Sequence, residues 1–196
     1  EIAIIFLDLL GFDLIAFTRS IGDICIPETE YRYEDIAENM LYMPNNAYAK
    51  KASDYLESCM KNQDSSGGIV ECRVKGMPAG IGETVFDKLD ASLAKAVVSI
   101  GAVKGVEIGD GFEPTKIHGS SNKDAYTSQN GTDIKKTNHA GGILGGMSDG
   151  SELILRAAFK PTPSISKEQQ TINTAFEDTT IAITGRHDPV VVPRAV

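Results

Sequence analysis

The sequence VECRVK, residues 70–75, decides the fold class that we predict for this chain. Its apolar side chains alternate strictly with charged ones, which is the period of a strand with one face in the core and one in water. The next apolar pattern, residues 85–100, repeats at intervals of three and four and predicts a helix that ends at Gly101. Alternating strands favour sheets with one exposed face over buried parallel sheets. We therefore expect an α+β fold.

Other elements follow from the same two periods. Residues 2–10 are apolar all round and are followed by Gly11, which predicts a helix buried in the core. Residues 13–26 predict a strand that turns before Pro27, and residues 47–61 predict an amphipathic surface helix. The remaining strand candidates are residues 103–112, 152–159 and 179–184.

Length and composition limit the class of protein. A chain of 196 residues suits one domain, so we expect residues 1–196 to form a single domain, with flexible loops at 63–68 and 116–136. The formal net charge of -8 argues against a nucleic-acid-binding protein, because such proteins cluster Lys and Arg against phosphates. A few cations in a cleft can nevertheless bind a small anion.

Cysteines and apolar runs indicate the compartment. Cys25, Cys59 and Cys72 are odd in number and lack metal-ligand spacing, so they predict neither a disulfide framework nor a zinc site. No apolar run approaches the roughly 20 residues that a membrane helix needs, and no membrane partner is expected. We expect a cytoplasmic protein, or a plastid one if the source has plastids. The first residue, Glu1, and the abrupt end at Val196 lead us to expect a longer protein.

The run GGILGG at residues 141–146 is a candidate phosphate loop, because glycine lets backbone N–H groups approach an anion closely. No Lys follows Gly146 as a Walker loop requires, and the spacing is not G-x-G-x-x-G. The residues alone favour a structural turn. The alternative is a backbone that contacts a ligand.

A second candidate is the segment KPTPS. Lys160 supplies a cation, Thr162 and Ser164 supply hydroxyl groups, and Pro161 and Pro163 hold the backbone extended. These groups suit a phosphate. The prolines are equally consistent with the simple end of a strand.

A third candidate packs a guanidinium, an imidazole and a carboxylate into consecutive positions, Arg186, His187 and Asp188. Arg can hold a phosphate with two hydrogen bonds, and a nearby Asp can accept a proton. The alternative, which the residues alone favour slightly, is a surface Arg–Asp pair with an Asp–Pro turn. His118 and His139 show no metal-ligand spacing with His187. From the residues alone we infer an anion-binding α+β domain.

Several long strings of residues are distinctive in their sequence and in their order along the chain. They are MPAGIGE (77–83) with VFDKLD (85–90), AVKGVEIGDGF (102–112), TNHAGGILGG (137–146), KPTPSI (160–165), and GRHDP (185–189) with VPRAV (192–196). Together they resemble the chorismate synthase family, and the resemblance covers nearly everything from Gly68 onward.

The resemblance implies a layered fold of helices between antiparallel sheets, assembled as a homotetramer. It also implies a lyase that converts a small phosphorylated substrate, 5-enolpyruvylshikimate-3-phosphate, to chorismate by 1,4-anti elimination of phosphate with reduced FMN. Whether NADPH serves as the reductant is left open by the resemblance. The cofactor would carry the hard chemistry while the protein binds, orients and excludes water.

The resemblance also implies roles for individual residues. Asp188 falls where the family transfers a proton beside the flavin, which reverses the preference for a structural pair, and His187 supports it. Asn138 and His139 are weaker candidates for lining the site. The positions that match flavin contacts of the family are Gly101, Ala102, Gly145, Lys160, Pro161, Thr162, Pro163, Ser164 and Arg186.

The chain also departs from the family pattern. Gly101 stands where the family usually has Asn, and Val190 stands where it usually has Cys. The family's amino-terminal motifs, with two catalytic histidines and an Arg/Ser-rich flavin loop, have no counterpart among these residues. We therefore expect a chain of these residues alone to be inactive. The competing hypotheses are a non-catalytic flavin- or phosphate-binding module derived from the enzyme, and a purely structural interaction domain.

Overall fold

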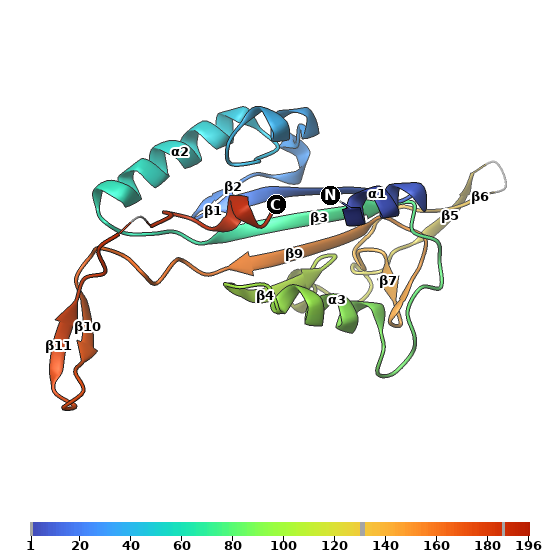
Figure 1. Ribbon diagram of the computed structural model, residues 1–196. Helices are drawn as coiled ribbons and strands as arrows, with labels where there is room; N and C mark the ends of the chain where they lie inside the picture. The colour runs from blue at the N-terminus through green and yellow to red at the C-terminus, as the bar shows by residue number, and fades with distance from the viewer. Residues whose placement is uncertain (1, 130–131, 186) are drawn as a thin grey trace. The chain divides into compact units, whose positions relative to one another are not determined.

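The computed structural model describes residues 2–129, 132–185 and 187–196 (Figure 1). The chain divides into two compact units: a first unit of Glu1–Ala16 with Glu71–Ala157, and a second unit of Phe17–Val70 with Ala158–Val196. Three strands, β1, β3 and β9, each run along the chain from one unit into the other. The single-domain expectation stays a prediction.

Helices and antiparallel strand pairs occur together, which confirms the predicted α+β class. A five-stranded sheet has the order β2-β1-β3-β9-β4, and three two-stranded sheets pair β5 with β6, β7 with β8 and β10 with β11. The helices are α1 (Ile2–Leu9), α2 (Asn46–Lys61) and α3 (Leu89–Val98), with 3-10 turns at Glu28–Glu30, Tyr33–Glu38, Glu113–Lys116 and Val192–Arg194. The strands are β1 (Asp13–Ile21), β2 (Ile24–Cys25), β3 (Gly68–Lys75), β4 (Val103–Ile108), β5 (Tyr126–Gln129), β6 (Thr132–Lys135), β7 (Ile143–Leu144), β8 (Met147–Ser148), β9 (Leu153–Phe159), β10 (Gln169–Ile172) and β11 (Asp178–Ile181).

The core of the first unit lies between its strands and α3. Val74, Ile143, Leu153 and Leu155 are buried there, and Leu93 of α3 packs against them. Burial of this apolar surface is the main favourable term in folding, at roughly 25 cal/mol per Å².

The β3 strand was predicted correctly, but its expected half-buried character is wrong. Glu71 is 0% exposed and Arg73 is 6% exposed, so the charged face is also buried. Arg73 Nε and Arg156 Nε donate to the two carboxylate oxygens of Glu71 at 2.7 and 2.9 Å. Arg156 also donates to the Gly109 carbonyl at 2.7 Å, and Arg73 donates to Glu152 at 3.2 Å. Alternation could not reveal this, because Arg156 and Glu152 lie 85 and 79 positions along the chain from Glu71 and Arg73.

The α1 helix forms as predicted, and Gly11 follows it with φ 83°. Its expected burial is wrong. Among its large apolar side chains, Ile5 is 61% exposed, Phe6 is 62% and Leu9 is 80%. An apolar helix is normally buried, so this exposed surface is a property that the sequence did not predict.

The α3 helix is shorter than the predicted range 85–100. Val85 has φ 72°, which no right-handed helix allows, and the helix begins at Leu89. The Leu89 N–H donates to the Gly146 carbonyl at 2.7 Å, so a distant loop satisfies one of the free N–H groups of the first turn. The apolar period extends to residues before Leu89, so it predicted too early a start. Contacts with distant residues set where the helix begins.

The second unit is built around α2, whose prediction is confirmed. The Asn45 side chain accepts hydrogen bonds from the N–H groups of Ala47 and Tyr48, the usual start of a helix. The helix buries one face, and the opposite face carries the exposed Lys50–Asp54 pair. The buried residues of α2 are Ala49, Ala52, Leu56 and Cys59.

Two polar segments contain hairpins. The expected loop 116–136 includes β5 and β6, paired from Tyr126↔Lys135 to Gln129↔Thr132. Strand β11 begins one residue before the predicted strand 179–184 and ends three residues before its predicted end, and it pairs with β10. The flexibility expected of 63–68 and 116–136 stays a prediction.

Candidate functional site

The candidate residues occur in both units. Gly101, Ala102 and Gly145 belong to the first unit, whereas the 160–164 segment, His187 and Asp188 belong to the second. Arg186 lies outside the described residues. Each group is therefore considered in its own unit.

The 160–164 segment leaves polar groups available to a ligand. Among the described residues no carboxylate pairs with Lys160, whose ammonium donates only to the neighbouring Pro161 carbonyl at 3.5 Å. The Thr162 Oγ1 atom is buried and has no hydrogen-bond partner. A buried polar atom without a partner is costly and points to a missing bonding group. The exposed Lys160 ammonium suits a phosphate or another small anion, while the Thr162 hydroxyl two residues later is closed to solvent.

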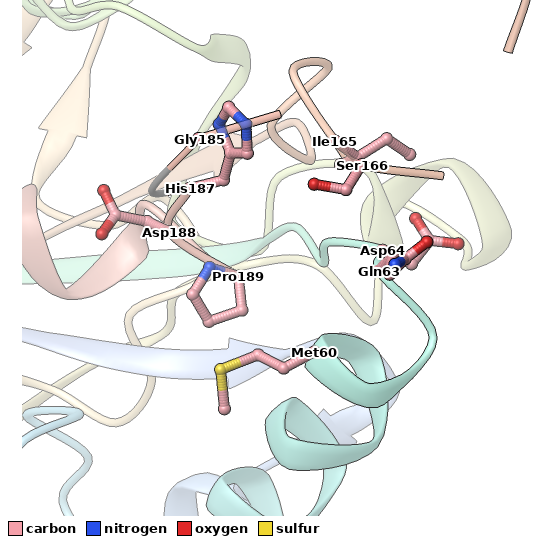
Figure 2. Close-up of a pocket in the computed structure, with 9 residues that line it drawn as sticks. All are labelled: Met60, Gln63, Asp64, Ile165, Ser166, Gly185, His187, Asp188 and Pro189. Carbon is pink, nitrogen blue, oxygen red and sulfur yellow. The ribbon is translucent and has the colours of Figure 1, made fainter. Parts of the chain in front are cut away.

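His187 and Asp188 lie at a small cavity of about 160 Å³ (Figure 2). A cavity of this size holds a small group but is below the roughly 300 Å³ of a typical site for a whole cofactor. Figure 2 shows the carboxylates of Asp188 and Asp64 on opposite sides of this group of residues. The cavity is lined by Met60, Gln63, Asp64, Ile165, Ser166, Gly185, His187, Asp188 and Pro189.

The carboxylate of Asp188 is held by Arg194. The Arg194 Nη2 atom lies 3.1 Å from Oδ1 and 2.8 Å from Oδ2 of Asp188. The Asp188 side chain is 32% exposed, so it is ordered by the ion pair yet open to a ligand. This pairing fixes where a proton-accepting oxygen would stand.

The His187 ring is held by the backbone. Its Nε2 lies 3.0 Å from the Ile183 carbonyl oxygen, which can only accept, so Nε2 carries the proton of this bond. In the neutral ring Nδ1 is then the acceptor nitrogen. The Ser166 hydroxyl donates to the same carbonyl at 3.1 Å.

A loop at residues 63–67 joins the two candidate motifs of the second unit. The Ser65 hydroxyl donates to the Thr162 carbonyl at 2.7 Å, and the Ser66 N–H donates to the Pro189 carbonyl at 2.8 Å. Ser66 is only 4% exposed. The structure thus brings together the 160–164 segment and the end of the GRHDP string, two motifs that are about 25 positions apart in the sequence.

Asp64 of this loop is a structural anchor. Lys167 Nζ donates to its carboxylate at 3.0 Å, and this hydrogen bond, with one from the Ser65 N–H, lowers the pKa of Asp64 below its usual value. The negative charge is thereby balanced within the second unit.

Ala102 and Gly145 of the first unit have unusual backbones. Ala102 has φ 71°, a left-handed conformation that strains a residue with a Cβ atom by an order of 1 kcal/mol. Gly145 has φ 61°, and a Cβ atom built there would meet no atom within 4 Å. Gly101 has the same open surroundings. Open space beside strained backbone is consistent with close approach of a ligand.

The weaker candidates Asn138 and His139 have partners within the protein. The Asn138 side chain donates to the Glu152 carbonyl at 2.7 Å and accepts from the Gly142 N–H at 3.0 Å. His139 Nδ1 lies 2.5 Å from an Asp110 carboxylate oxygen. These contacts shape the turn before the glycine run, which is the structural role that the residues alone favoured.

Asp124 anchors the same turn. Its carboxylate accepts the N–H groups of His139 and Ala140 at 2.8 and 3.0 Å and the Thr137 hydroxyl at 2.6 Å. Burial, the largest influence, raises the pKa of Asp124, but these hydrogen bonds and the charge of Lys135 give a net lowering.

Sequence reasoning missed several residues around the cavity. Arg194 belongs to the string VPRAV, but the sequence does not predict that it pairs with Asp188, and it predicts no role for Asp64 or Ser166. No spacing could have identified Asp64, because it lies more than 100 positions from its partner Lys167. Arg194 lies six positions from Asp188, which is the one local signal available.

No group of metal-binding side chains occurs among the described residues. Likewise, in the described part of the chain no helix has the length and apolar character to cross a membrane.

Comparison with known proteins defines the class. The family model of chorismate synthase matches residues 1–196. A chorismate synthase of Agathobacter rectalis is 54% identical over 195 residues, which are 100% of this chain and 53% of the relative. One of Lachnoclostridium phytofermentans is 58% identical over 188 residues, 95% of this chain and 51% of the relative.

A solved structure, described as a crystal structure of chorismate synthase, is similar with a TM-score of 0.74 and 28% identity. The match covers 81% of this chain and 52% of that one. It confirms the predicted chorismate-synthase-like fold.

The chain belongs to the chorismate synthase family. It spans about half the length of the curated relatives that it matches.

Proposed function

We propose that these residues form the flavin- and phosphate-binding side of a chorismate synthase, whose whole protein converts 5-enolpyruvylshikimate-3-phosphate to chorismate and phosphate. The observation that carries the proposal is the match of the family model to residues 1–196, supported by relatives above 50% identity over nearly the whole chain. The Lys160 ammonium, which no carboxylate of the described residues pairs, supplies the positive charge that a phosphate needs, and the Thr162 hydroxyl two residues later lacks a hydrogen-bond partner.

Reduced FMN, when bound, would supply and recover electron density while phosphate leaves and a ring proton is lost. In the second unit, the residues that would hold it are Lys160, Thr162 and Ser164; in the first unit, Ala102 and Gly145 are positions that the resemblance matches to flavin contacts. These groups can attract an anion although the overall charge is -8, because the electrostatic potential in a cleft depends mainly on the groups nearby.

Asp188 is the proposed proton-transfer group. Arg194 holds its carboxylate in one orientation, and about a third of the side chain remains accessible. A carboxylate at a fixed place can accept a proton within hydrogen-bond distance. His187, held through Nε2, presents Nδ1 as a further acceptor beside it.

The cavity of about 160 Å³ is too small for the whole cofactor, so the proposal requires further walls from residues beyond its nine lining residues. This agrees with the expectation that these residues alone are inactive. A non-catalytic flavin- or phosphate-binding module remains the second candidate, favoured by the same unpaired groups of Lys160 and Thr162.

The test is anaerobic titration of the whole protein with reduced FMN and substrate. A change in flavin absorbance with formation of chorismate supports the enzyme, and a change without product supports the module. If the spectrum does not change and no product forms, both proposals are wrong. Repeating the assay with NADPH and oxidised FMN decides whether NADPH acts as the reductant.

A further inference from the structure

Three buried charged side chains meet beside the glycine run 141–146 of the first unit. The side chains of Lys135, Asp124 and Asp149 are 8%, 6% and 9% exposed. The Lys135 ammonium donates to the Asp149 carboxylate and lies 3.9 Å from Oδ2 of Asp124. Burying charges is costly, and a buried ion pair is by itself weak evidence for stability. The arrangement points instead to a role in fixing the backbone that these side chains contact.

The two carboxylates hold opposite ends of the glycine run. Asp124 accepts hydrogen bonds from the backbone N–H groups of the two residues just before the run, at 2.8 and 3.0 Å. Asp149 follows the run, and its own N–H donates to the Gly142 carbonyl at 3.0 Å. Lys135 lies between the two carboxylates. The acidic clamp, as we call Asp124, Lys135 and Asp149, therefore ties the chain that enters the run to the chain that leaves it.

The glycine run is a hairpin that needs such a constraint. Strands β7 and β8 pair antiparallel, and Gly145 and Gly146 form the turn between them with φ 61° and 90°. Positive φ at both central residues is typical of a two-residue hairpin turn. Gly141 and Gly142, at the base, also have positive φ. Since glycine loses more conformational freedom on folding than any other residue, contacts with other segments have to hold this hairpin in one conformation.

We propose that the acidic clamp positions the hairpin that carries Gly145 and thereby sets the affinity of the protein for flavin. The inference rests on the proposed function, because the resemblance alone matches Gly145 to a flavin contact. A Cβ atom built at Gly145 would meet no atom within 4 Å, so its backbone is open to a ligand. A backbone already held in the bound conformation binds more tightly, because less freedom is lost on binding. Lys135 is thus a positioning residue and not a catalytic one.

The experiment compares Lys135→Met with Lys135→Arg in the whole protein. Met removes the ammonium and leaves two buried carboxylates without their shared counter-charge, whereas Arg keeps the charge. Anaerobic titration gives the Kd for reduced FMN, and turnover at saturating FMN gives kcat and the KM for substrate. The matched control is Lys116→Met, which removes an exposed ion pair with Glu113.

We expect Lys135→Met to raise the Kd for reduced FMN at least about tenfold, with kcat at saturating FMN within about twofold of the unchanged protein. Lys135→Arg should restore most of the affinity, and Lys116→Met should leave the Kd unchanged. An unchanged Kd in Lys135→Met would overturn the proposal. A lower kcat at an unchanged Kd would overturn it too, as would an equal loss of affinity in the Met and Arg variants.

Hydrogen exchange of residues 139–146 in the flavin-free protein tests the positioning itself. We expect faster exchange there, and not throughout the first unit, in Lys135→Met and in Asp149→Asn, which serves alone if Lys135→Met does not fold. Unchanged exchange, or faster exchange spread over the whole unit, would overturn the positioning role. Absence of FMN binding in the unchanged protein would instead contradict the proposed function, and with it the flavin part of this inference.

Discussion

Asp188 shows how one residue's role depends on its neighbours. The sequence offered two interpretations of its carboxylate, a surface ion pair and a proton-transfer group. Among the described residues Asp188 forms an ion pair with Arg194, which leaves about a third of the Asp188 side chain accessible. A residue that is both oriented and accessible is suited to proton transfer.

We expect Asp188→Asn in the whole protein to retain FMN and to lose turnover by at least about 100-fold, within the range of general acid–base catalysis. The amide keeps the shape but accepts protons poorly. Flavin titration and a chorismate assay measure the two effects. Arg194→Met is the matched variant, which frees the carboxylate and should reduce turnover less. Normal turnover of Asp188→Asn would remove this residue from its role.

The cysteines differ in predicted reactivity. Burial, with the charge of Glu71, raises the pKa of the Cys72 thiol to about 11, whereas Cys25 is exposed. At pH 8 only about one Cys72 thiol in a thousand is then the reactive thiolate. Iodoacetamide followed by mass spectrometry should modify Cys25 and leave Cys72 and the buried Cys59 intact. Comparable rates at Cys25 and Cys72 would contradict this.

At the scale of elements, the buried charges of β3 and β9 are the main departure from expectation. Burying an ion is expensive unless it is paired, and Glu71 is paired with both Arg73 and Arg156. Arg156 also holds the Gly109 carbonyl, so the network fixes the end of β4. Breaking it should therefore destabilise the first unit.

Glu71→Gln should lower the free energy of unfolding by about 3 kcal/mol, because two guanidinium groups lose their buried counter-charge. Urea denaturation measures this change. The matched control is Glu113→Gln, which removes an exposed pair with Lys116 and should change stability by less than about 1 kcal/mol. Equal effects of both variants would show that the buried network adds nothing.

The same network predicts a dependence of stability on pH. Burial raises the pKa of Glu71, but the hydrogen bonds and charges of Arg156 and Arg73 outweigh it and give a net lowering. Asp149, outside this network, adds to the same dependence: burial raises its pKa, but Lys135 and Ser151 give a net lowering. A group whose pKa is lower in the folded than in the unfolded protein stabilises the fold at pH values above its unfolded-state pKa. This stabilisation is lost as the pH falls through the folded-state pKa. Urea midpoints should be constant near neutrality and decline as pH falls below about 4.5. In Glu71→Gln the decline should be smaller, and an identical decline would contradict this assignment.

The helices and strands also show which parts of the fold sequence periodicity can predict. Periodicity located α2, β3 and β9 to within a residue or two, because each buries its own apolar positions. It placed the start of α3 four residues early, because Val85 continues the apolar period while its backbone has φ 72°. Periodicity did not predict the β5–β6 hairpin, because its two four-residue strands, YTSQ and TDIK, have no apolar alternation.

At the scale of the whole molecule, charge governs the choice of partners. A net charge of -8 repels polyanions at long range, and no carboxylate of the described residues neutralises the Lys160 ammonium locally. We expect no mobility shift of double-stranded DNA at 150 mM salt, even at micromolar protein. A salt-dependent shift would show that a basic surface overrides the total charge. For a small anion we expect the opposite result. Calorimetry should detect binding of inorganic phosphate, and Lys160→Met should weaken it.

The sequence by itself determined the α+β class, the helix at Asn46–Lys61, the main strands and the family, because these depend on local periodicity and on ordered strings of residues. Tertiary structure alone decided that Glu71 is buried between two arginines, that Arg194 holds Asp188, and that the 63–67 loop joins two distant motifs. It also decided that α1 is exposed. The physical reason is that burial and pairing depend on which segments and side chains meet in the folded chain, and periodicity reports only which face of an element is apolar.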